Sequence, residues 1–261
     1  MMTETSSLSE REDAPLKTRA VAADTMFGEW RRYLDFVRRP VLPDAAHTVS
    51  GGSVLGIARM WALDVVLMGI LLSIAGLIVM IGIDLPENAL SGLSWGPEII
   101  AAVVIVAPIV EETGFRGWLS GRPGHILAWA VFLLTGAVLS YVARATGTET
   151  GAASYIALAV MLALIVGALY YFRKAPAMGW FKRLFPLLFW LSTLAFALVH
   201  LWNYTEGSLA YLLPFVVPQF VAGSIFGYVR VHYGLWASIL THALHNGLAV
   251  ALVLSIGEAA T

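Results

Sequence analysis

The sequence predicts an all-α, polytopic transmembrane bundle of about seven helices, preceded by an amphipathic helix. Composition is the first reason: 59% of the 261 residues are hydrophobic and 13% are charged, and the mean hydropathy is positive, unlike a soluble domain. Length is the second, because a membrane-spanning helix needs about 20 mostly apolar residues. Stretches of this kind cover residues 61–83, 98–119, 125–144, 152–172, 184–204, 209–230 and 234–256.

Residues 1–50 are expected to form a cytoplasmic tail with an amphipathic helix, ahead of one transmembrane domain over residues 51–261. The tail begins polar and charged, without the apolar core of a signal peptide. Its later part mixes apolar and basic side chains, which is typical of a helix in the membrane interface, and each basic residue near anionic lipid contributes about 1 kcal/mol. The residues concerned are Phe27, Trp30, Tyr33, Leu34 and Val37, with Arg31, Arg32, Arg38 and Arg39.

Basic residues in the loops predict the orientation, since cytoplasmic loops of membrane proteins collect Lys and Arg. Eight of the 16 basic residues lie in the tail or its junction, and others follow the second, fourth and sixth spans, including Arg122 and Arg230. Arg144 alone falls on the other side. Seven spans then place the N-terminus in the cytoplasm and the C-terminus outside. The alanine-rich chain suggests a multi-pass protein of a bacterial inner membrane.

Composition also narrows the partners and the chemistry. The formal net charge is −1 and argues against nucleic acid, whereas the apolar spans require a lipid bilayer. The chain has no cysteine, which leaves His, Glu, Asp and Asn as candidate metal ligands. In the sixth span, Gly223 and Gly227 predict close packing against a neighbouring helix, and Pro214 and Pro218 predict a kink.

Three pairs of residues, each four positions apart, place polar groups inside predicted spans. An ionisable group at bilayer depth costs about 2.5–3.5 kcal/mol on insertion scales, so such groups are expected to converge inside the protein. Each pair shares one helix face. The pairs are Glu112/Arg116 with Glu111 beside them, Phe196/His200, and His242/Asn246 with His245 on an adjoining face.

The two neighbouring glutamates are expected to differ. Glu112 can pair with Arg116 in the favourable acid-before-base order, whereas Glu111 points about 100° away and has no partner on its own helix. Burial should raise the proton affinity of the unpaired carboxylate. Glu111 is therefore the candidate general base, and Glu112 organises the site.

Several roles are open to this set of side chains. A carboxylate, two imidazoles and an amide can activate water and stabilise an oxyanion, as amide hydrolysis requires. Glu111, His200 and His242 could instead hold a divalent metal such as Zn²⁺ with one position open to water. The glutamates could also contact water at the cytoplasmic end of their span, and the histidines could form interhelical hydrogen bonds or part of a proton-coupled carrier.

The motifs Glu-Glu-x-x-x-Arg, Phe-x-x-x-His and His-x-x-x-Asn, in this order, resemble those of the CPBP family of intramembrane proteases. That family includes the type II CAAX prenyl endopeptidases and bacterial relatives linked to bacteriocin processing or self-immunity. The resemblance covers about residues 98–250 and includes Gly234-Leu235-Trp236-x-Ser238-Ile239. Each motif alone is weakly specific, but all three in order, each within a span, are quite specific.

The resemblance implies an endopeptidase that cleaves a peptide or membrane-associated protein. Glu111 would activate water held with the help of His200, and His242 and Asn246 would stabilise the oxyanion. Glu112 and Arg116 would brace the first motif. Family members have been called metalloproteases and also metal-free glutamate proteases; we favour the metal-free reaction, because Asn is a poor metal ligand and a good oxyanion donor. The alternative is a non-catalytic immunity or binding partner that uses the same polar patch.

One expectation conflicts with a shared site. The predicted boundaries place Glu111 and His242 about eight residues from the cytoplasmic side, or roughly 12 Å deep at 1.5 Å per residue. His200 lies about sixteen residues from that side. Straight parallel helices would keep these groups apart, so a shared site requires a later start of the fifth span, or tilted helices around a cavity.

Overall fold

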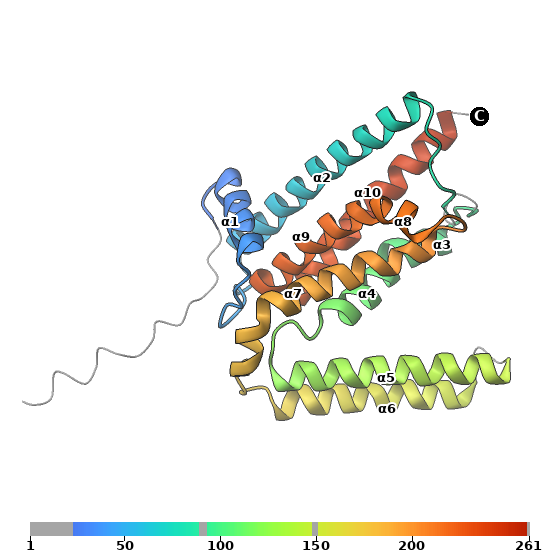
Figure 1. Cartoon of the computed structure of the whole chain (residues 1–261). Helices are drawn as coiled ribbons and strands as arrows, with labels where there is room; N and C mark the ends of the chain where they lie inside the picture. The colour runs from blue at the N-terminus through green and yellow to red at the C-terminus, as the bar shows by residue number, and fades with distance from the viewer. Residues whose placement is uncertain (1–22, 89–92, 148–150, 260–261) are drawn as a thin grey trace, which may run out of the picture.

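The computed structural model describes residues 23–88, 93–147 and 151–259, which form a bundle of helices (Figure 1). The amphipathic helix is α1 (Met26–Arg38), and it lies at the end of the bundle where α2 (Gly51–Met80) begins. α2 starts ten residues before the predicted span, because Ser50 and Ser53 form a capping box at its N-terminus. The C-terminal end of α10 lies at the opposite end of the bundle (Figure 1).

Within the described residues, six helical segments are long and apolar enough to cross a membrane. They match six of the seven predicted spans. These segments are α2; α5 (Pro123–Thr146); α6 (Ala152–Tyr171); α7 (Gly179–Val199) with the 3-10 turn η2 (His200–Asn203); α8 (Leu209–Leu212) with the 3-10 turn η3 (Leu213–Val216) and α9 (Val217–Tyr233); and α10 (Leu235–Ala259).

The predicted span 98–119 differs from the other six. It forms a continuous helical run that changes type, from α3 (Pro97–Ala101) through the π-helical η1 (Ala102–Val106) to α4 (Ala107–Arg116). Figure 1 shows α3 at the end of the bundle opposite α1, and α4 leading back from it. The run is not among the six apolar spans because its second half carries Glu111, Glu112 and Arg116.

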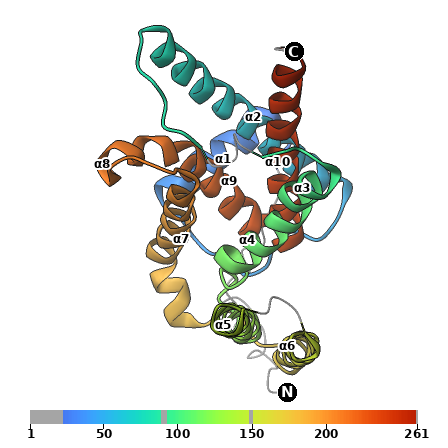
Figure 2. The ribbon, with the colours of Figure 1, turned by 90° about the vertical axis from the view of Figure 1, so that its right-hand side faces the viewer.

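α9 lies in the middle of the bundle, with α2, α4, α7 and α10 around it (Figure 2). Its predicted close packing is confirmed. A Cβ added to Gly223 would lie 2.9 Å from the Phe196 ring, and one added to Gly227 would lie 2.7 Å from the Phe189 ring, both on α7. At the two prolines of the predicted kink the helical run changes type, from α8 through the 3-10 turn η3, which contains Pro214, to α9, which has Pro218 in its first turn.

α7 supplies much of the aromatic core. Phe181, Phe185 and Phe189 recur every four residues and are buried on one face of the helix. Phe36 of α1 packs on the last two, with ring centroids 6.4 Å and 5.0 Å away. Pro186 lies inside α7, where it removes a helical hydrogen bond, and the helix bends near its start (Figure 1).

α1 is docked on the bundle, which the prediction of an interfacial helix did not include. Its buried side chains are Glu29, Tyr33 and Phe36, whereas Phe27 and Leu34 of the predicted apolar set are exposed. The Tyr33 hydroxyl lies 2.6 Å from the Ser224 hydroxyl of α9. The apolar face of α1 is therefore divided between the protein core and the surface.

Candidate active site

The first motif builds a buried ion pair on α4. Glu112 and Arg116 are both fully buried, and Arg116 Nη1 donates to Glu112 Oε1 over 2.6 Å. The same carboxylate oxygen lies 2.9 Å from His242 Nδ1, and Oε2 lies 2.5 Å from Ser238 Oγ. An unpaired charge at such depth would cost several kcal/mol, and three partners on two helices remove that cost. Ser238 belongs to the family-like run before the third motif.

Arg116 has further partners from the second motif and from α9. Its guanidinium carbon lies 3.9 Å from the centre of the Phe196 ring, and Nη2 donates to the carbonyl of Gly223 over 3.3 Å. A cation over an aromatic face is stabilised by the ring quadrupole, and burial strengthens the effect. This contact explains why an aromatic residue precedes His200 by four positions.

The Glu111 side chain extends from a different side of α4 than that of Glu112. Its Oε2 is buried without a hydrogen-bond partner and lies 3.9 Å from both His200 Nε2 and His242 Nε2. These distances are too long for direct hydrogen bonds, and a water molecule between the groups would be within reach of all three. The structure thus brings the carboxylate of the first motif to the histidines of the other two.

The hydrogen bonds of the two imidazoles indicate which nitrogen faces Glu111. His200 Nδ1 lies 2.7 Å from the carbonyl of Phe196, which can only accept, so this nitrogen carries a proton. His242 Nδ1 likewise donates to the carboxylate of Glu112. Both Nε2 atoms are therefore directed at Glu111, and the Phe226 ring stacks on His242 with centroids 4.7 Å apart.

The predicted difference in depth between Glu111 and His200 does not separate them. α4 ends at the fully buried Arg116, so it ends inside the protein and the chain reaches α5 through residues 117–122. α7 bends near Pro186 and ends at Val199, with His200 as its C-cap residue. Counting residues from a common membrane surface overestimated the separation, because α4 ends inside the protein and α7 is not straight.

A hydrogen bond joins Asn246 to the π-helical turn that precedes the first motif. Its Nδ2 donates to the carbonyl of Val103 in η1 over 2.9 Å. The irregular turn directly precedes Pro108, which has no backbone N–H to offer Val104 four residues earlier. One amide hydrogen of Asn246 is used in this bond, and the side chain has a second.

Side chains from three helices satisfy the C-terminal carbonyls of α4, which would otherwise be orphaned in the interior. Trp129 Nε1 donates to Gly114 over 2.6 Å, Ser192 Oγ donates to Phe115 over 2.6 Å, and Arg230 donates to Arg116 and Gly117 over 2.9 Å and 3.0 Å. The prediction that Arg230 lies in a cytoplasmic loop is wrong, because Arg230 is buried in α9. The sequence signal for this buried position was a basic residue within an apolar span.

A second buried acid–imidazole pair lies beside the motifs. Asp64 of α2, which is 1% exposed, lies 2.7 Å from Nδ1 of His245, and its other carboxylate oxygen has no hydrogen-bond partner. The His245 ring also contacts the Phe226 ring edge to face. Asp64 was missed because it stands alone in the first span, without a motif around it. The pair joins α2 to α10 next to His242.

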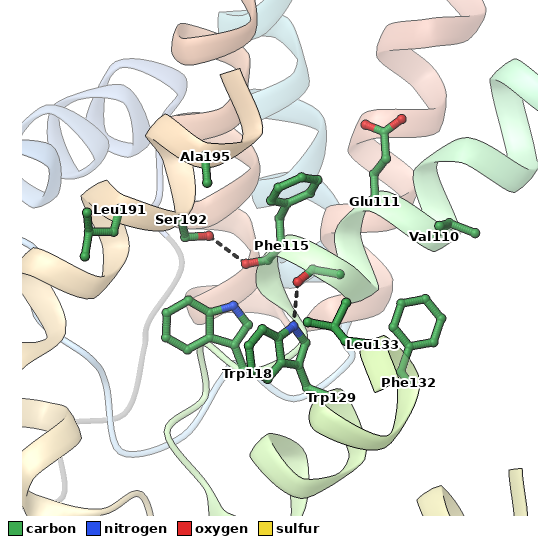
Figure 3. Close-up of a pocket in the computed structure, with 11 residues that line it drawn as sticks. Val110, Glu111, Phe115, Trp118, Trp129, Phe132, Leu133, Leu191, Ser192 and Ala195 are labelled. Carbon is green, nitrogen blue, oxygen red and sulfur yellow. Dashed lines mark hydrogen bonds between the residues drawn. The ribbon is translucent and has the colours of Figure 1, made fainter. Parts of the chain in front are cut away.

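A cavity of about 510 Å³ opens beside Glu111, between α4, α5 and α7 (Figure 3). Figure 3 shows Trp118 and Trp129 on one side and the Glu111 carboxylate pointing away from them at the edge. The polar atoms of Trp129 and Ser192 are used in capping α4, so the wall that they present is apolar. The lining comprises Val110, Glu111, Gly114, Phe115, Trp118, Trp129, Phe132, Leu133, Leu191, Ser192 and Ala195.

The three predicted metal ligands come from three different helical segments. Glu111, His200 and His242 converge, with carboxylate-to-imidazole distances of 3.9 Å. In the part of the chain that the structure describes, no group of three or more His, Asp or Glu side chains is arranged to hold a metal ion.

The fold and site together define a membrane-embedded carboxylate–imidazole centre with an adjoining apolar cavity. The family described as Type II CAAX prenyl endopeptidase Rce1-like matches residues 94–181 and 171–248, more than half of the chain. The protein belongs to this family of CAAX-type intramembrane proteases, which confirms the resemblance seen in the three motifs. No curated protein and no solved structure matches the chain.

Proposed function

We propose that this protein is an intramembrane endopeptidase in which Glu111 activates the attacking water. One observation supports this assignment most strongly: Glu111 Oε2 is buried, has no hydrogen-bond partner, and lies 3.9 Å from the Nε2 atoms of both His200 and His242. A buried acceptor without a partner is costly unless a ligand or water satisfies it. A water molecule held there would be next to a general base and an apolar substrate cavity.

In the proposed reaction, water loses one proton to the Glu111 carboxylate while its oxygen adds to the scissile carbonyl carbon. His200 Nε2 accepts the second hydrogen of this water and orients it, since Nδ1 is fixed on the Phe196 carbonyl. The tetrahedral oxyanion then collapses and breaks the C–N bond. The proton on Glu111 passes to the departing amine, which leaves two neutral termini before they ionise.

His242 and Asn246 are proposed to stabilise the oxyanion. Nδ1 of His242 already donates to Glu112, so donation from Nε2 requires a ring with both nitrogens protonated. Asn246 would contribute its second amide hydrogen, and Arg116 keeps Glu112 ionised and in place.

The substrate is proposed to be a peptide or a membrane protein with an apolar group near the cleaved bond. The cavity beside Glu111 is bounded by aromatic and aliphatic side chains, and its volume lies in the range of small-molecule sites. An apolar side chain or a lipid substituent would fit these walls. We expect an unprenylated substrate in a bacterial inner membrane, and matched peptides with and without a prenyl group would compare the two.

The proposed orientation places the α1 end of the bundle in the cytoplasm. The basic residues of α1 and of the α6–α7 connection lie toward this end, and the N-terminus of the described chain lies there too (Figure 1). The opposite end carries exposed acids. They are Asp84, Glu87, Glu98 and Glu206.

Cleavage of a quenched peptide library by purified protein tests the proposal. Glu111→Gln should lower the rate by about 10³-fold or more, because it removes the base and keeps the shape. Glu98→Gln is the matched control, since Glu98 is an exposed glutamate at the start of the same helical run. Wild-type rates in Glu111→Gln would contradict the proposal.

Two further experiments distinguish the alternative functions. A strong chelator should leave the rate unchanged, whereas a loss that Zn²⁺ restores would assign the reaction to a metal. Biological activity that survives in Glu111→Gln and His242→Ala would instead favour a non-catalytic immunity or binding partner.

A further inference from the structure

The two faces of α1 differ in exposure. One face is buried on the bundle through Glu29, Tyr33 and Phe36. The opposite face presents a row that we call the outer stripe, consisting of Phe27, Arg31, Leu34 and Arg38. These four residues follow the spacing of one helix face, and all are exposed, with Phe27 76% and Leu34 48% accessible.

The outer stripe is held rigidly by the buried face. Glu29 is fully buried, and its Oε1 accepts from the hydroxyls of Tyr228 and Tyr233 over 2.8 Å and 2.6 Å. Its Oε2 accepts from the backbone of Ala23 over 2.8 Å. Burial raises the pKa of Tyr33 above its ordinary value, so its hydroxyl stays protonated beside Ser224. α1 therefore cannot rotate to hide Phe27 and Leu34.

α1 is attached near the start of α2, one of the helices long and apolar enough to cross a membrane. Trp30 Nε1 of α1 donates to the carbonyl of Arg59 over 2.8 Å, and Arg59 donates to the carbonyls of Ala23 and Asp24. Near the start of α2, Val54 and Leu55 are more than half exposed, as expected for a lipid-facing helix. The outer stripe is thus near the depth of the lipid headgroups.

We propose that the outer stripe of α1 binds anionic lipid headgroups. Arg31 and Arg38 would contact phosphate oxygens, while Phe27 and Leu34 enter the acyl boundary, the pattern expected of an interfacial helix. Asp35 also pairs with Arg38 at 3.1 Å, but both side chains are largely exposed, and such a pair contributes little. Alternating basic and apolar groups match a lipid surface better than a wholly apolar protein contact.

The absence of cysteine from the chain makes a direct measurement possible. Leu34→Cys in the full chain is labelled with an environment-sensitive fluorophore and reconstituted into phosphatidylcholine vesicles, with and without phosphatidylglycerol. Quenching by acrylamide, a neutral aqueous quencher that the vesicle charge does not repel, should fall when phosphatidylglycerol is present, and added salt should reverse the change. Equal quenching in neutral and anionic vesicles would overturn the proposal.

Charge variants distinguish the stripe from a general surface effect. Arg31→Gln/Arg38→Gln should abolish the protection, since two arginines at about 1 kcal/mol each correspond to roughly 30-fold in lipid association. Lys174→Gln/Arg183→Gln removes the same charge from exposed residues outside α1 and should keep the protection. Equal loss in both double variants would contradict a specific role of α1. None of these readouts depends on proteolysis.

Discussion

The helices that carry the site and the α5–α6 hairpin differ in what surrounds them. About a third of the apolar window is buried in α7, in the α8–α9 segment and in α10, at 33%, 39% and 28%, against 6% in each of α5 and α6. Figures 1 and 2 show α5 and α6 side by side and outside the group of helices around α9, although Trp129 of α5 contacts α4. The hairpin is nevertheless more hydrophobic than the α8–α9 segment or α10.

This difference shows where specific packing lies in the protein. Hydrophobicity drives the insertion of a helix into lipid but does not drive the association of helices there, because lipid tails are as apolar as the side chains. Small residues, buried ion pairs and interhelical hydrogen bonds do so in the site-bearing helices. Substitutions of the same kind should therefore have large effects around α9 and small effects in α5 and α6.

The largest effect on stability is expected from Arg116→Met. It leaves Glu112 charged and buried without its main partner, which costs about 3–5 kcal/mol. Thermal unfolding in mild detergent measures the loss. Arg144→Met removes an exposed arginine from α5 and should leave the unfolding temperature close to wild type; equal losses in the two variants would remove the distinction between the regions.

A smaller loss is expected when a methyl group is added to the α7–α9 contact. Gly223→Ala places a Cβ 2.9 Å from the Phe196 ring and 3.0 Å from Arg116 Nη2, and overpacking of this kind costs about 1–3 kcal/mol. The controls are Gly136→Ala in α5 and Gly167→Ala in α6, where a Cβ meets nothing within 4 Å. Those two variants should be as stable as wild type or slightly more so.

The caps on α4 provide the third comparison. Ser192→Ala leaves the buried carbonyl of Phe115 without its hydrogen bond, at a cost of about 1–3 kcal/mol, and should also lower cleavage because α4 carries Glu111. Ser73→Ala removes a hydroxyl that bonds only a carbonyl of its own helix at an exposed position of α2. If Ser73→Ala lost as much stability and cleavage as Ser192→Ala, the loss would not be specific to the caps on α4.

Much of the site could be predicted because spacing on a helix is a local property. The Glu112–Arg116 pair and the isolation of Glu111 follow from 100° per residue, and both are present. Asp64 and Arg230 could not be paired with their partners, since each contacts residues far away in the sequence. Arg230 lies at the end of a predicted span, and the rule that cytoplasmic loops collect basic residues therefore placed it in a loop.

The prediction that Glu111 and His200 lie far apart in depth was wrong for a related reason. Hydropathy locates a span but not the point where its helix ends, and α4 ends early because Trp129, Ser192 and Arg230 cap it inside the protein. The same limit applies to α1, whose apolar positions were predicted without knowing which of them would meet α9.

Cross-linking between α4 and α7 tests most directly the central claim, that motifs from separate helices form one site. In the cysteine-free chain, Glu111→Cys/His200→Cys is treated in membranes with a short bifunctional thiol reagent, beside Glu111→Cys/Val166→Cys, whose second position lies on α6. The account predicts an intramolecular link in the first pair, because the native side chains approach to 3.9 Å, and none in the second. No link in the first pair, in protein that remains folded, would contradict the shared site.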